Sequence, residues 1–328
     1  MTSSVRTTRR TALAAAVAVA LTAGSTVALS GTAAAGTTES AVTTAPLVRG
    51  LYQSAYSERN DALWVTVSVG RPPVTDATTG AREAVYGVAV DDEHNTVWVT
   101  NTRDDTVAVY SQRTGAHLAT LPDVAHAREI VVDERHDTVW ASGFGDGSVV
   151  AFDSKTFEEK RRITVEGAGP AGLAVNESTG TVYASDLNGD RIIEVSAKSD
   201  TPRFVPAGDG PISLALSADG RTAYTADQSA GTVSVVDLAA GAVAKSVATG
   251  AGALSVAAVD RGGNVLVVNR TAANVTVVAP RAASVVGTVA TGANPNHVEV
   301  AGRTAYVVDK SGAGAGGEDQ VTRIRVGG

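Results

Sequence analysis

The chain has 328 residues, a formal net charge of -7 and no cysteine. The lack of cysteine excludes disulfides, thiolate metal sites, a cysteine nucleophile and a lipoprotein anchor. The acidic balance disfavours binding to phosphate backbones, so a nucleic-acid partner is not expected.

Residues 1–35 have the pattern of a secretory signal peptide. Three arginines precede a largely apolar run at 12–23, and three alanines at 33–35 stand before Gly36 as a small-residue cleavage site. The run is too short and too rich in alanine for a membrane span. The expected mature chain, 36–328, has 293 residues and a charge of -10 once the three arginines are subtracted. It is expected to be secreted, either free or associated with the cell envelope, by Sec or twin-arginine export.

A four-residue phrase recurs seven times along the chain. It begins with an aromatic residue or leucine, continues with two small or β-branched residues and usually ends in Asn or Asp. The copies, called tetrads below, begin at Trp64, Trp98, Trp140, Tyr183, Tyr224, Leu266 and Tyr306. Their spacings of 34, 42, 43, 41, 42 and 40 residues are typical of a repeat array. The closing Asn or Asp is expected to start a turn rather than to join a ring of ligands.

Each copy alternates with a period of two, in short apolar runs separated by Gly, Asp or Asn. Four antiparallel strands in about 42 residues match the size of one propeller blade. The sequence therefore predicts an all-β fold: residues 36–328 form a single domain, a seven-bladed β-propeller of four-stranded antiparallel blades.

The two ends of the array predict how the ring closes. The last copy supplies only three strands, and residues 41–48 are expected to be the fourth, so an N-terminal strand completes the last blade. The first blade is expected to be shortened, because its spacing is 34 residues and Arg71-Pro72-Pro73 and Thr78-Thr79-Gly80 stand where its third and fourth strands belong. Proline cannot donate to a strand ladder.

The phrase Val97-Trp98-Val99-Thr100-Asn101, the strand at 105–110 and the Gly-Pro motifs at 169–174 and 210–215 resemble the YVTN β-propeller repeat. That repeat occurs in bacterial exported YncE-like proteins and in archaeal surface-layer proteins, and the resemblance covers residues 41–326. It implies an exported, usually non-catalytic propeller, which we expect to be a monomer. A propeller fold does not by itself transfer a function.

Alignment of the first strands on the tetrads predicts two rings of residues around the central channel. The ring at the channel entry comprises Gln53, Gly87, Glu129, Gly172, Ser213, Ser255 and His297. The ring two residues deeper comprises Ala55, Ala89, Val131, Ala174, Ala215, Ala257 and Glu299. Small residues are expected where seven strands converge, so the polar exceptions mark a candidate site.

The candidate ligand-binding residues are Gln53, Tyr52, Tyr86, Arg128, Glu129, His297 and Glu299. Together they could hold a polar ligand, with Gln53, His297 and Glu299 expected as one cluster. A divalent cation is the one cofactor considered, with only Glu129 and Glu299 as carboxylate ligands. The alternative is that a water-filled channel tolerates polar residues anywhere. His94 and His136 are expected to be solvated residues in turns of the opposite face.

No catalytic sequence motif is present. The leading hypothesis is a secreted, non-catalytic propeller that binds a protein partner or a small polar ligand at the channel mouth. The alternative is a metal-dependent hydrolase or lyase of the propeller lactonase or streptogramin-lyase type, with His297 as base. Single-stranded DNA binding is a third hypothesis, which 4% aromatic residues and the acidic charge disfavour.

Overall fold

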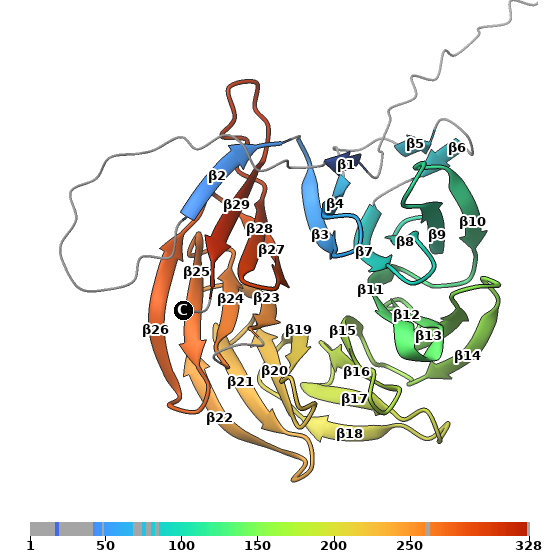
Figure 1. Cartoon of the computed structure of the whole chain (residues 1–328). Helices are drawn as coiled ribbons and strands as arrows, with labels where there is room; N and C mark the ends of the chain where they lie inside the picture. Colours follow the sequence, from blue (N-terminus) through green and yellow to red (C-terminus); the bar gives the residue numbers. More distant parts are fainter. Residues whose placement is uncertain are drawn as a thin grey trace, which may run out of the picture.

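The computed structural model describes residues 17–19, 42–47, 49–67, 74–76, 80–82, 85–259 and 263–326. Its strands form a ring of antiparallel sheets, and one strand of each sheet faces the centre, apart from a two-stranded sheet at the periphery (Figure 1). The one helical element in this part of the chain is a 3-10 turn, η1 (Glu134–His136). Across the same described ranges, no helix combines the length and the apolar character needed to cross a membrane.

Six four-stranded blades make up most of the ring. Five of them use consecutive strands. These are β7 (Val85–Asp91), β8 (Thr96–Asn101), β9 (Thr106–Ser111) and β10 (His117–Leu121); β11 (Ala127–Asp133), β12 (Thr138–Gly143), β13 (Ser148–Asp153) and β14 (Glu159–Thr164); β15 (Pro170–Asn176), β16 (Thr181–Asp186), β17 (Arg191–Val195) and β18 (Arg203–Pro206); β19 (Pro211–Leu216), β20 (Thr222–Asp227), β21 (Thr232–Asp237) and β22 (Ala242–Ala248); and β23 (Ala253–Ala258), β24 (Val265–Asn269), β25 (Asn274–Ala279) and β26 (Ser284–Ala290).

The sixth blade closes the ring with strands from both ends of the described chain. It consists of β27 (Pro295–Ala301), β28 (Thr304–Asp309), β29 (Gln320–Arg325) and the outer strand β2 (Val42–Pro46). β2 pairs with β29 from Val42 opposite Ile324 to Pro46 opposite Gln320. The predicted closure by an N-terminal strand is confirmed.

The prediction of seven four-stranded blades is wrong, since the described residues form six. The first tetrad lies instead in a three-stranded sheet of β3 (Leu51–Ser57), β4 (Ala62–Val67) and β1 (Val17–Val19), which we call the N-terminal sheet. β3 contacts both β27 and β7, so this sheet occupies the ring position between the closing blade and the β7–β10 blade (Figure 1).

Chain length explains the smaller sheet. Only 17 residues separate β4 from β7, whereas 25 separate β8 from β11. Within those 17, β5 (Val74–Asp76) and β6 (Gly80–Arg82) pair with each other instead of extending the sheet. The expected shortening of the first copy is thus confirmed, although its prolines at 72 and 73 lie outside the described residues. The edge of β4 is covered by β1, which falls inside the predicted signal peptide.

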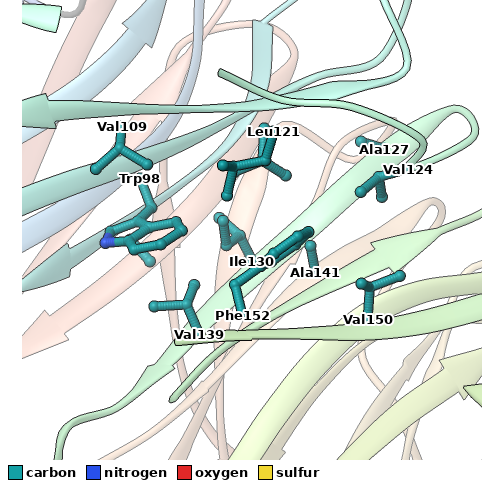
Figure 2. Close-up of a cluster of buried hydrophobic side chains, with 12 residues drawn as sticks. Trp98, Val109, Leu121, Val124, Ala127, Ile130, Val139, Ala141, Val150 and Phe152 are labelled. Atoms are coloured by element: carbon teal, nitrogen blue, oxygen red, sulfur yellow. The ribbon is translucent and has the colours of Figure 1, made fainter. Parts of the chain in front are cut away.

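The tetrads supply the packing between sheets. The first residue of every tetrad is buried, with 0 to 8% of its surface exposed. Trp98, for example, lies with Val109 against Ile130, Val139 and Phe152 of the next blade (Figure 2). The period near 40 therefore reflects the repeated need to fill one sheet-to-sheet interface with a large side chain.

Tyr306 makes the equivalent contact at the closure of the ring. It packs on Leu51, Leu63 and Val65 of the N-terminal sheet. The three-stranded sheet is therefore packed into the ring by the same contact that joins the complete blades.

Candidate functional site

Each inner strand carries an irregularity where it enters the ring. All seven inner strands shift register against their neighbour within the first few pairs. Such a bulge turns a side chain toward the axis and leaves a backbone N–H outside the ladder. The predicted entry ring falls at these irregularities.

Hydroxyl groups of the tetrads compensate the bulges in four sheets. The third tetrad residue accepts the displaced N–H there, at 2.7–3.0 Å. The pairs are Gln53 to Thr66, Gly87 to Thr100, Glu129 to Ser142 and Gly172 to Ser185. The hydroxyls of Thr66 and Thr100 also donate to the carbonyls of Tyr86 and Arg128 on the next inner strand. The small polar residue of the tetrad thus fixes the position of the entry ring.

In the remaining sheets the entry residue itself bridges to the next inner strand. Ser213 Oγ accepts the N–H of Val256 at 3.4 Å, and Ser255 Oγ accepts that of Val298 at 3.2 Å.

His297 takes the equivalent place, because its Nδ1 lies 3.4 Å from the backbone nitrogen of Ser54. An accepting Nδ1 leaves the ring proton on Nε2. Burial lowers the pKa of His297 to about 4, so the ring is neutral at pH 7. Its position is explained by the bridge between sheets.

The two predicted rings line two adjacent spaces on the axis. All seven residues of the deeper ring line a cavity of about 560 Å³. Five entry-ring residues line a pocket of about 200 Å³, here called the mouth pocket: Gln53, Glu129, Ser213, Ser255 and His297. The other two are glycines, and a Cβ at Gly87 would lie 2.5 Å from the carbonyl oxygen of Arg128. The predicted register of the inner strands is confirmed.

One hydrogen bond spans the floor of the mouth pocket. Gln53 Nε2 donates to Glu129 Oε2 at 2.9 Å, passing the position of Gly87, which has no side chain. Burial raises the pKa of Glu129 to about 7, and the bond from Gln53 opposes that rise. Glu129, Ser213 and His297 line both spaces and so mark the boundary between them.

Glu299 belongs to the deeper cavity and not to the mouth pocket. The expected cluster of Gln53, His297 and Glu299 is therefore divided between two levels of the channel. Burial raises the pKa of Glu299 to about 8, and the charge of Glu129 adds to the rise, while a hydrogen bond from the backbone of Tyr56 opposes it.

The raised pKa of Glu299 predicts a pH dependence of stability. Between pH 4.5 and about 8 the unfolded chain releases this proton while the folded chain keeps it, so the free energy of unfolding falls as pH rises. Glu129 acts in the same direction up to about pH 7, whereas His297 lowers stability only below pH 6.5. Glu299→Gln removes the titrating carboxyl group, so its free energy of unfolding relative to the wild type should be about 1–2 kcal/mol higher at pH 8.5 than at pH 5. The gain is no larger because water reaches the channel wall and screens the charge.

Urea unfolding at the two pH values measures this gain. Glu58→Gln, on an exposed turn, is the matched control and should leave the pH profile unchanged. An identical profile for Glu299→Gln and the wild type would contradict the assignment of Glu299 to a buried, protonated state.

Aromatic rings and an arginine form the rim of the mouth pocket. The rings of Tyr52 and Tyr86 lie 4.6 Å apart, and burial raises the pKa of both phenols. The guanidinium carbon of Arg128 lies 3.8 Å from the ring centre of Phe144 and 5.8 Å from that of Tyr86. Arg128 Nε is buried and has no hydrogen-bond partner among the described residues.

Sequence reasoning missed two further cations at this rim. Arg270 lines the mouth pocket, and its Nη1 donates to Asn296 Oδ1 at 2.9 Å. Lys310 Nζ lies 3.9 Å from the ring centre of Tyr52, and burial together with the charge of Arg270 lowers its pKa to about 8. Both residues directly follow a tetrad, as does Gln228 in the same pocket. The position after the tetrad was therefore the signal that could have identified them.

The Asn and Asp residues that end the tetrads have a structural role. Asp186 accepts N–H groups of Gly169 and Asn188 at 2.7 and 3.3 Å, and Asp309 accepts those of Ser311 and Gln320 at 3.0 and 3.1 Å. Both carboxylates are fully buried. The expected turn role is confirmed for these two residues.

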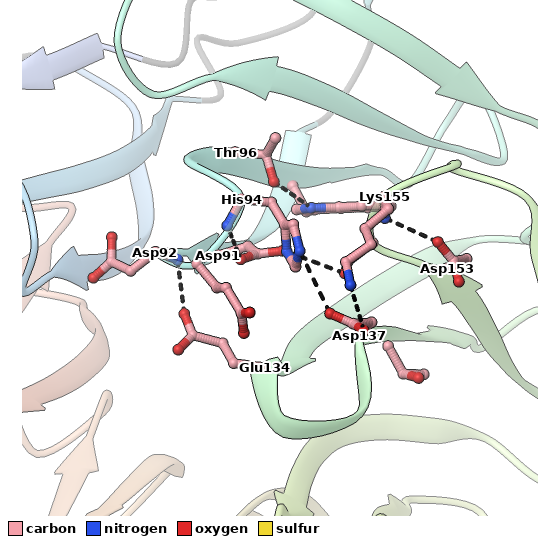
Figure 3. A network of polar contacts seen from close by, with 12 residues as sticks. Asp91, Asp92, His94, Thr96, Glu134, Asp137, Asp153 and Lys155 are labelled. Carbon is pink, nitrogen blue, oxygen red and sulfur yellow. Dashed lines mark hydrogen bonds and ion pairs between the residues drawn. The ribbon is translucent and has the colours of Figure 1, made fainter.

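A second polar cluster lies in the turns at the opposite end of the sheets (Figure 3). His94 Nδ1 lies 2.8 Å from the buried carboxylate of Asp91, and His94 Nε2 lies 3.4 Å from Asp137 of the next blade. Asp137 also pairs with Lys155 at 2.7 Å. The expectation of a solvated His94 is wrong, because its side chain is only 18% exposed and bridges two blades, whereas that of His136 is 41% exposed. Glu93, His94 and Asp137 are close enough together to hold a metal ion.

The candidate carboxylate ligands are not part of that cluster. Within the described ranges the group with metal-binding spacing excludes Glu129 and Glu299. Comparison with protein-family models and with curated proteins finds no match to this chain. The fold and the mouth pocket are therefore the observations from which function is inferred.

Proposed function

We propose that the protein is a secreted, monomeric propeller of the YVTN type that binds a small polar ligand, or a polar group of a partner protein, at the mouth of its channel. The mouth pocket is the observation that carries this proposal. Side chains from several sheets line it, and hydrogen bonds within and between these sheets hold the inner strands in place. A pocket with few, rigidly placed polar groups is typical of a binding site.

Three features favour binding over catalysis. The low pKa of His297 makes its imidazole a weak base, and its Nδ1 is engaged with Ser54. One carboxylate oxygen of Glu129 is engaged with Gln53. Glu299 lines a different cavity. A metal-dependent hydrolase or lyase would need the two acids to hold one cation between them, and that remains the alternative.

A ligand screen by thermal shift and ligand-observed NMR tests the proposal. Gln228 is exposed at the mouth, so Gln228→Trp is expected to fill the pocket and abolish binding without disturbing the core. Arg281→Trp, in a groove that shares no lining residue with the mouth pocket, is the control and should still bind. A ligand that binds Gln228→Trp as tightly as the wild type would contradict binding at the mouth.

The same screen includes calcium and magnesium. We expect neither ion to raise the melting temperature of the wild type. A rise that disappears in Glu299→Ala would instead support the metal-dependent enzyme.

A further inference from the structure

We infer that the mouth pocket selects a small oxyanion, a carboxylate or phosphate group, as its ligand. This inference rests on the proposed function and adds the chemical class of the ligand. The charge distribution provides the first reason. The chain as a whole has a net charge of -7, yet two arginines line the pocket and a lysine stands at its rim. A concave site that is lined by charges of one sign attracts ligands of the opposite charge.

Arg128 provides the second reason. Its guanidinium lies over Phe144, which holds the plane of the group, and its buried Nε has no partner among the described residues. A carboxylate or phosphate offers paired oxygens that match the donors of a guanidinium, so the guanidinium of Arg128, which lines the pocket, suits such a ligand.

Arg270 and Lys310 provide the third reason. Asn296 is held by the carbonyl of Tyr52 and in turn engages only Nη1 of Arg270, so Arg270 retains other donors. Lys310 stands over the ring of Tyr52, and burial, together with the neighbouring charge of Arg270, disfavours its protonated form. A bound anion would relieve this repulsion between cations.

The acids near the mouth do not cancel these charges. Glu129 is the one carboxyl group that lines the pocket; burial raises its pKa to about 7, so it is only partly ionised at pH 7, and its Oε2 accepts the hydrogen bond from Gln53. The charge of Asp319 raises the pKa of Lys310, but the carboxylate of Asp319 is engaged because it accepts backbone N–H groups of Gly50, Leu51 and Gly312. The pocket of about 200 Å³ restricts the ligand to a small molecule or a single side group.

Titration of the full chain with inorganic phosphate, benzoate and benzamide, followed by NMR, tests the inference. Benzamide has nearly the shape of benzoate but no charge. We expect benzoate, phosphate or both to bind, and benzamide to bind at least about tenfold more weakly. The stronger of the two anions identifies the source of the oxyanion as a carboxylate or a phosphate.

Substitutions then locate the site. Arg270→Gln and Arg128→Gln should each weaken anion binding by about tenfold, and Arg281→Gln, outside the mouth pocket, should leave it unchanged. If Arg128→Gln fails to fold, Arg128→Lys keeps the charge but not the fork of donors, and should bind more weakly than the wild type. Equal anion binding by the wild type and Arg270→Gln would overturn the inference.

The two proposals fail in different ways. If benzamide or another neutral ligand binds as tightly as benzoate and is lost in Gln228→Trp, the oxyanion inference is wrong and the binding function stands. If no ligand of any charge binds at the mouth, both are wrong.

Discussion

Replacement of Trp98 by alanine is expected to destabilise the fold by about 4 kcal/mol, the usual cost of removing a buried aromatic side chain. Trp98 is fully buried between two blades, with Phe152 and Phe157 at ring-centre distances of 6.4 and 5.5 Å. Its indole N–H donates to Thr96 Oγ1, which would also lose a partner. Since this interface joins two sheets, the surrounding backbone cannot easily collapse into the cavity. Chemical denaturation measures the loss, and a fall in melting temperature of roughly 10 °C should accompany it.

Leu118→Ala is the matched control, because Leu118 lies on β10 of the same blade and is 47% exposed. It should change the free energy of unfolding by less than about 0.5 kcal/mol. Trp98→Phe retains most of the buried volume and should fall between the two. A loss below about 1.5 kcal/mol for Trp98→Ala would contradict the interface shown in Figure 2.

Relative to the chain that begins at Gly36, a chain that begins at Leu47 lacks β2 and is expected to be less stable by about 3 kcal/mol. β2 is paired with β29 over five residues, and each backbone hydrogen bond of such a ladder contributes about 1 kcal/mol net. The deletion also removes the hydrogen bond between Thr44 Oγ1 and Thr322 Oγ1. The side chains of β2 are exposed, so backbone pairing rather than hydrophobic burial accounts for the loss.

The matched control is a truncation that begins at Val42 and retains β2. It should unfold at the same denaturant concentration as the chain that begins at Gly36. The chain without β2 should also associate, because the bare edge of β29 can pair with a second molecule. Size-exclusion chromatography detects that association. Equal stability of the chain that begins at Val42 and the chain without β2 would show that β2 does not close the ring.

Much of the fold was predictable because the repeat encodes it locally. The tetrad from Trp98 to Asn101 contains, in fixed order, a large side chain that fills the interface between sheets, two strand residues and a residue that begins a turn. The spacing of the tetrads therefore revealed the blades. In the first copy the short spacing predicted a reduced sheet but not its pairing. The described strands β5 and β6 pair with each other instead of extending the sheet of β3 and β4, which no pattern within one copy shows.

The candidate site was only partly predictable. Alignment of the copies placed Gln53, Glu129 and His297 at the channel entry, where the structure has them. It did not reveal that Gln53 reaches Glu129 past Gly87, because that bond joins residues 76 positions apart in different sheets. Nor did it show that Glu299 belongs to a separate cavity. Glu299 is only two residues beyond His297 in sequence, but two residues along a strand move a side chain to another level of the channel.

By itself, the sequence determined the strand repeat, the large residues that fill the interfaces between adjacent sheets and the closure of the last blade by the N-terminal strand. These follow from patterns within single copies and from the missing strand at the end of the array. Only the tertiary structure decided the number of complete blades and the character of the mouth pocket. In an acidic chain, Arg128 comes from a copy far in sequence from the two neighbouring copies that supply Arg270 and Lys310, and their charges act together only because the ring brings those copies to one axis.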